Sequence, residues 1–150
     1  MSQSLASISR PGEKPSQTWF EQVYRGLRTW TVSDVNQHAA IAATTILNTR
    51  QPVPSGLFRV WWYLAVVTAA GTSSSATVTI GFTDQGVAKT ISGVALTGNT
   101  TATVQGQAAF IRADPDTAIT YAVAYASNAA AAMHYDVSVR VEACPVESAV

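Results

Sequence analysis

Charged residues are scarce in this chain of 150 residues. Lys, Arg, Asp and Glu make up 12% of it, compared with about 25% in a typical soluble domain. The nine basic and nine acidic residues give a net charge of zero, and the only lysines are Lys14 and Lys89. Because basic residues do not cluster, the sequence lacks the electrostatic footprint of a nucleic-acid-binding protein. A surface with so little charge is better suited to burial against other subunits than to a monomer dispersed in solution.

Cysteine and histidine are also rare. Cys144 is the only cysteine, which excludes an internal disulfide framework, and the two histidines are His38 and His134. These residues do not supply the spaced ligand set that a metal site requires. Asp84, Asp114 and Asp116 fall in predicted turns and are too few for the six or more oxygens that calcium takes. We therefore expect no metal and no cofactor.

The motifs of common catalytic sites are missing as well. The sequence contains no Gly-x-Ser-x-Gly elbow, no phosphate-binding loop, no His-x-x-x-His pair and no dinucleotide fingerprint. Asp34 and His38 could meet in a turn, but no nucleophile accompanies them. His134, Asp136 and Arg140 alternate along one predicted strand and form a solvated polar row. We expect that the protein is not an enzyme.

Long apolar segments are absent. The first 16 residues lack the apolar stretch of a signal peptide, and the most apolar run, residues 57–70, contains Arg59 and is too short to span a bilayer. We expect a protein that is made in a cytoplasm and is not anchored in a membrane.

The N-terminal part of the chain is predicted to be an arm with one short helix. Residues 1–16 are rich in Ser and Pro and show no hydrophobic period. Residues 18–21 fit a capping box, and an apolar stripe follows at helical spacing: Phe20, Val23, Tyr24 and Leu27. So short a helix must dock on something, either its own domain or a neighbouring subunit. We assign residues 1–30 to this region and residues 31–150 to one folded domain.

From Thr29 onward the hydrophobic period changes to two, which is typical of half-buried strands. The pattern predicts about eight strands separated by turns, which indicates an all-β, antiparallel, jelly-roll-like β-sandwich. The predicted strands are 29–35, 40–47, 57–68, 77–83, 87–91, 101–113, 119–126 and 133–142, with a short link at Leu96.

Two predicted strands, at residues 57–67 and 119–126, are apolar or small on both faces. In residues 57–67, one face carries Phe58, Val60 and Trp62, and the other carries aromatic residues as well. We expect one face in the core and the other against a second subunit or against the chain's own arm and helix. The favoured assembly is a homotrimer, and the predicted subunit interface contains Arg59, Trp61, Tyr63, Ala122 and Ala124.

Several segments together resemble a known group of proteins. They are Gly56-Leu57-Phe58-Arg59-Val60-Trp61-Trp62-Tyr63-Leu64, residues 78–84, 96–101, 110–114 and 119–122, and the final strand at 135–142. Together they resemble the small jelly-roll structural proteins of tailed-bacteriophage virions, and the Gly-Leu-Phe-x-Val opening is similar to C1q/tumour-necrosis-factor-like folds. The resemblance covers roughly residues 40 to 142.

The resemblance implies a structural component of a virion. The favoured role is a capsid decoration, or cement, protein that binds the assembled head and stabilises its lattice through the major capsid protein. The alternative is a tail-tip, fibre or collar module that binds a receptor on the host surface. For the first role, the expected partner-binding residues are Trp19, Phe20, Tyr24, Arg25, Arg28 and Trp30.

Overall fold

The computed structural model describes residues 29–49, 56–127 and 130–144. These residues form strands and turns and contain no helix, and therefore none that could cross a membrane. The strands are β1 (Thr29–Gln37), β2 (Ile41–Asn48), β3 (Leu57–Thr68), β4 (Ser75–Asp84), β5 (Val87–Ser92), β6 (Leu96–Thr97), β7 (Val104–Arg112), β8 (Ala118–Ala126) and β9 (His134–Ala143).

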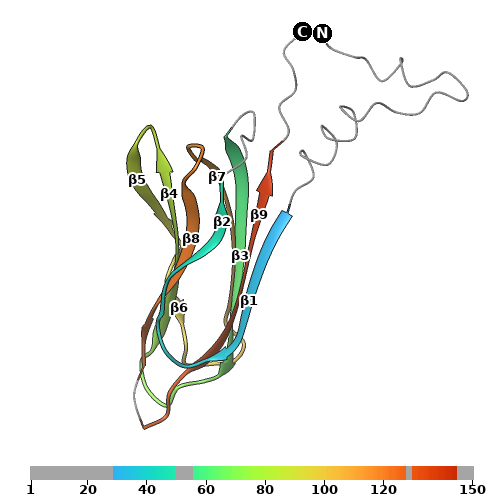
Figure 1. The fold of residues 1–150 in the computed structure, drawn as a ribbon. Helices are drawn as coiled ribbons and strands as arrows, with labels where there is room; N and C mark the ends of the chain where they lie inside the picture. Colours follow the sequence, from blue (N-terminus) through green and yellow to red (C-terminus); the bar gives the residue numbers. More distant parts are fainter. Residues whose placement is uncertain (1–28, 50–55, 128–129, 145–150) are drawn as a thin grey trace, which may run out of the picture.

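The strands pair in a nested order. β1 pairs with β9, β2 with β8, β3 with β7 and β4 with β5, and each of these pairs is antiparallel. The chain can therefore be followed as one long hairpin whose tip is the β4–β5 turn. The successive pairs of this hairpin alternate between two sheets, which face each other in Figure 1.

This arrangement is the predicted jelly-roll sandwich. One sheet has the strand order β1-β9-β3-β7, and the other has the order β2-β8-β4-β5, with the two-residue strand β6 paired to β4. We call them the β3 sheet and the β4 sheet. The all-β antiparallel class is confirmed, and the link expected at Leu96 forms the extra strand β6. The helix predicted within residues 18–28 lies outside the described residues.

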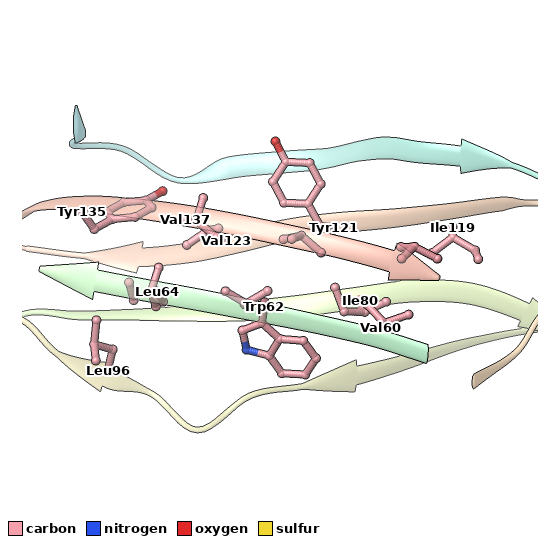
Figure 2. Close-up of a cluster of buried hydrophobic side chains, with 14 of the residues drawn as sticks. Val60, Trp62, Leu64, Ile80, Leu96, Ile119, Tyr121, Val123, Tyr135 and Val137 are labelled. Atoms are coloured by element: carbon pink, nitrogen blue, oxygen red, sulfur yellow. The ribbon is translucent and has the colours of Figure 1, made fainter. Parts of the chain in front are cut away.

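The core lies between the two sheets and follows from strand alternation. In β3, every second side chain from Phe58 to Val66 is buried, and β9 alternates in the same way from Tyr135 to Ala143. Figure 2 shows side chains of both sheets in this core, among them Trp62 and Leu64 of β3 and Ile80 and Tyr121 of the opposite sheet. Because β3 and β9 are adjacent central strands, they supply much of the apolar area that holds the sheets together.

The turn at the tip of the long hairpin has the residues that its geometry requires. Gln85 and Gly86 both have positive φ angles, of 56° and 72°, as in a two-residue type I′ turn. The Asp114 carboxylate accepts hydrogen bonds from the backbone N–H groups of Gln85 and Gly86, at 3.0 and 2.7 Å. The turn of the β4 sheet is thus tied to the segment that follows β7 in the other sheet.

Some boundaries differ from the sequence prediction. β1 already includes Thr29 and Trp30, so the sandwich begins before residue 31. The strand expected from residue 101 starts at Val104, because residues 98–102 form bends and a turn.

Candidate interaction surfaces

The outer side of the β3 sheet carries most of the exposed apolar side chains. Eight large hydrophobic side chains are exposed among the described residues, and five of them project from this side of β3 and β7. Phe110 is 68% exposed and Tyr63 is 46% exposed. Contiguous apolar surface rimmed by polar residues is typical of interaction sites. We call this surface the aromatic face: Leu57, Arg59, Trp61, Tyr63, Ala65, Val67, Val104, Gly106, Ala108 and Phe110.

The register between β3 and β7 arranges the aromatic face in rows. Arg59 lies beside Phe110, Trp61 beside Ala108 and Tyr63 beside Gly106, and the next row joins Ala65 to Val104. Each of these rows contains one large apolar side chain beside a smaller or cationic one. The surface is therefore uneven, with projections at Phe110, Trp61 and Tyr63.

A charged pair borders the aromatic face on the β9 side. The Arg140 guanidinium lies over the Trp61 ring, 5.3 Å from its centroid, within the range of a cation–π contact. Arg140 Nη2 is 3.0 Å from Glu142 Oε1. Trp61 is consequently half-buried, whereas Tyr63 and Phe110 have more of their surface open to solvent.

The outer side of the β4 sheet is built differently. Its central rows join Thr120 to Gly81 and Thr90, and Ala122 to Thr79 and Ser92. The hydroxyl oxygens of Thr79 and Ser92 are 2.9 Å apart. These positions carry small, uncharged side chains, so this outer side is comparatively flat. We call it the small-residue face: Thr77, Thr79, Gly81, Thr90, Ser92, Thr120, Ala122 and Ala124.

The residues predicted at subunit interfaces lie on two different faces of the structure. Arg59, Trp61 and Tyr63 belong to the aromatic face, whereas Ala122 and Ala124 belong to the small-residue face of the other sheet. Because the two faces point away from each other, a single contact cannot cover both on the same copy. Sequence patterns place residues on the two sides of one strand but do not reveal which sheet that strand joins.

Most of the predicted partner-binding residues fall in the N-terminal region. Trp19, Phe20, Tyr24, Arg25 and Arg28 lie outside the described residues. Trp30 is described, and it lies on the inner side of β1, where it packs against the hydrophobic core. Its indole therefore contributes to the sandwich itself.

The prediction did not include the β7 residues of the aromatic face. Val104 and Phe110 are exposed on the same side as Tyr63. The alternation of Val104, Ala108 and Phe110 in the sequence could have placed these three on one side of their strand. What could not be read from the sequence is that β7 pairs with β3, which makes the two strands one surface.

The ionic groups at one end of the sandwich form a structural cluster. Asp84 Oδ1 accepts a hydrogen bond from Arg112 Nε at 2.6 Å, and Asp84 Oδ2 accepts one from Lys89 Nζ at 2.7 Å. The hydrogen bond from Lys89, followed by that from Arg112, lowers the pKa of Asp84 below its usual value of 3.8. The cluster joins β4, β5 and β7, and the aspartate is engaged by cations within the chain.

At the opposite end, polar side chains tie the corner between β1 and β2 to β9. The rings of His38 and His134 stack with centroids 5.3 Å apart, and His134 Nδ1 is 2.8 Å from Asn36 Oδ1. The backbone N–H of Asn36, which has a positive φ of 54°, donates to Asp136 Oδ1 at 2.6 Å. These contacts support a tight corner.

Asp34 and His38, whose positions in the sequence would allow them to meet in a turn, have separate partners. The Tyr121 hydroxyl donates a hydrogen bond to Asp34 Oδ2, whereas His38 stacks on His134. Burial, reinforced by the hydrogen bond to Asp34, raises the pKa of Tyr121 to about 12. The hydroxyl therefore stays protonated as a donor at physiological pH.

Among the described residues, no group of three or more His, Cys, Asp or Glu is placed to hold a metal ion.

No family model and no curated protein sequence matches the chain. Among solved structures, the sandwich is similar to a chain in the "Structure of infectious bursal disease virus Gt strain", with 18% sequence identity and a TM-score of 0.40. The match covers 77% of this chain and 31% of the other, so this chain spans about a third of that chain's length.

Proposed function

We propose that this protein is a non-enzymatic structural component of a virion, and that it decorates the assembled head of a tailed bacteriophage. The observation that carries the proposal is the aromatic face, an apolar surface on a sandwich whose own core is already complete. Such a surface is typical of a protein that works by association. The resemblance of residues 40 to 142 to jelly-roll virion proteins supplies the context.

In this proposal the two regions of the chain have different tasks. The sandwich associates with other copies, and the region before it binds the major capsid protein. Trp19, Phe20 and Tyr24 would be the apolar anchors, because aromatic side chains often dominate the energy of an interface. Arg25 and Arg28 would pair with acidic groups of the capsid. Decoration then stabilises the head by adding buried contacts between neighbouring capsid subunits.

The location in the virion is tested by labelling. Antibodies raised against the purified protein would be applied to particles from cells that carry the gene and visualised with gold by electron microscopy. Label distributed over the heads is expected. Label confined to the tail tip, fibres or collar would instead favour the receptor-binding alternative. Particles without label would contradict both roles.

The role of the N-terminal region is tested by binding to heads that lack the protein. Deleting residues 1–30 should abolish binding while leaving a folded sandwich. Because this deletion also removes Thr29 and Trp30 from β1, the matched variant deletes residues 1–28 only. Both variants are checked by circular dichroism and sedimented with the heads. Binding by the 1–28 deletion at the affinity of the full chain would contradict the proposed role of this region.

A further inference from the structure

The aromatic face has a pattern of sizes that fits a second copy of itself. Within its four central rows, the larger apolar side chain is Phe110, then Trp61, then Tyr63, and then Val104. The larger side chain of each row therefore belongs to β7 in the two outer rows and to β3 in the two inner rows. Every large side chain has a smaller or cationic neighbour on the adjacent strand.

We propose that two copies of this chain pair through their aromatic faces, about a twofold axis that runs parallel to the strands between β3 and β7. This operation lays β3 of one copy over β7 of the other within the same row. Trp61 then faces Ala108 of the second copy, and Tyr63 faces Gly106. In the outer rows, Phe110 faces Arg59 and Val104 faces Ala65. The large side chains of each copy thus pack against the smaller or cationic side chains of the other.

Charge favours this pairing. The Arg59 guanidinium comes over the ring of Phe110, a cation–π arrangement. The acidic residues beside the face, Asp136 and Glu142, belong to β9, on the far side of β3 from β7. The twofold axis carries them beyond the β7 edge of the second copy, so they do not confront each other. Like charges brought together would cost affinity.

A second twofold axis, perpendicular to the strands, fits less well. It would reverse the rows and place Trp61 over Tyr63 of the second copy, large on large. Ala108 would then face Gly106 and leave a gap between two small residues. Because well-packed contacts are what make an apolar interface favourable, the axis parallel to the strands is preferred.

The dimensions predict a weak, reversible dimer. Two strands about 4.8 Å apart and ten residues long present a surface of about 10 Å by 33 Å on each copy. An area of about 330 Å² per copy, or about 660 Å² in total, is below the roughly 1,200 to 2,000 Å² of standard specific interfaces and falls among weak, transient contacts. Pairing should thus depend on concentration in solution. This inference does not rest on the proposed location in a virion, because it concerns the protein alone.

The first test compares two exposed hydrophobic positions by sedimentation equilibrium of the full chain over a series of concentrations. Phe110→Lys removes the ring and places a cation opposite Arg59 of the second copy, so it should raise the dissociation constant of the dimer at least about tenfold, which corresponds to 1.4 kcal/mol. Val94→Lys is the control, because Val94 is 71% exposed and lies outside that face. Circular dichroism establishes that both variants fold. Equal dissociation constants for the two variants and the wild type would overturn the proposal.

The second test determines the geometry. In a Cys144→Ser background, Ala65→Cys and Val104→Cys variants carrying tags of different size are mixed with a mild oxidant. The proposed axis predicts a disulfide-linked pair containing one of each variant, and little linkage when either is oxidised alone. Equal linkage in all three samples, no linkage at all, or a trimeric mass for the wild type would overturn the twofold arrangement. So would a wild-type monomer that dimerises only after residues 1–28 are deleted, because the N-terminal region would then cover the face.

Discussion

The two sheets of the sandwich are alike on their inner sides and unlike on their outer sides. Inside, both present large apolar side chains in strict alternation, such as Trp62 from β3 and Ile80 from β4. Outside, the β3 sheet presents Tyr63 and Phe110, whereas the β4 sheet presents Ala, Thr, Ser and Gly. Folding requires the inner pattern alone. The pairing proposed above would give the large apolar residues on one outer side a role that folding does not.

The largest effect on stability is expected when two neighbouring tryptophans, Trp61 and Trp62, are each replaced by alanine. Trp62 is 1% exposed between the sheets, and Trp61 is on the outer side of the same strand. Trp62→Ala should lower the free energy of unfolding by about 3 to 5 kcal/mol, because it leaves a cavity in the core. Trp61→Ala should lower the free energy of unfolding clearly less, but it should weaken the pairing of two copies. Denaturant unfolding measures the first effect, and equal losses would contradict this division of β3.

Two glycines provide the next comparison. A Cβ atom on Gly98 would lie 1.9 Å from Met133 Sδ and 2.4 Å from Ser74 Oγ, whereas one on Gly106 would meet nothing closer than Tyr63 Cδ2 at 3.9 Å. Gly98→Ala should destabilise the protein by about 1 to 3 kcal/mol through overpacking. Gly106→Ala should leave stability unchanged or raise it slightly. Thermal unfolding of both variants checks this difference, and a larger loss at Gly106 would refute it.

The cluster around Asp84 should make a smaller, pH-dependent contribution. Since the pKa of Asp84 is lowered in the folded state, its contribution is present above the unfolded value of 3.8 and is lost as the pH falls through the folded pKa. Asp84→Asn should reduce stability at neutral pH and flatten its decline in acid. Unfolding at a series of pH values from about 6 to 2 measures both. The same slope in variant and wild type would exclude this role.

The smallest effect is expected on the small-residue face. Thr79→Glu places a charge between Ala122 and Ser92, in the middle of that face. Away from packed or buried features, such a substitution changes stability by no more than about 0.5 kcal/mol, and it should leave the mass in solution unchanged. If the mass fell, the face that contains Ala122 and Ala124 would also be a subunit contact, as the sequence pattern led us to expect.

Local patterns predicted the fold well. Alternation located β3, β8 and β9 almost to the residue, and the turn predicted at Asp84 is present at residues 84–86. The turn at residues 114–116 was likewise anticipated. These features depend on neighbours in the sequence, so a single sequence carries enough information to place them.

The candidate surface was predicted only in part. Arg59, Trp61 and Tyr63 were expected at an interface because their strand is apolar on both sides. Phe110 was not, because its contribution depends on the pairing of β3 with β7, about 50 residues apart. Ala122 and Ala124, which were also predicted at a subunit interface, face outward from the opposite sheet. Long-range strand pairing decides which half-buried strands share a surface.

The central claim is that the aromatic face is a surface for association, and the mass of the wild-type full chain in solution tests it most directly. Sedimentation equilibrium at increasing concentration should show a reversible rise from 15.8 kDa toward twice that mass. A mass that stays at the monomer value up to millimolar concentration would contradict the account, because an open aromatic face would then have no affinity for its own copy.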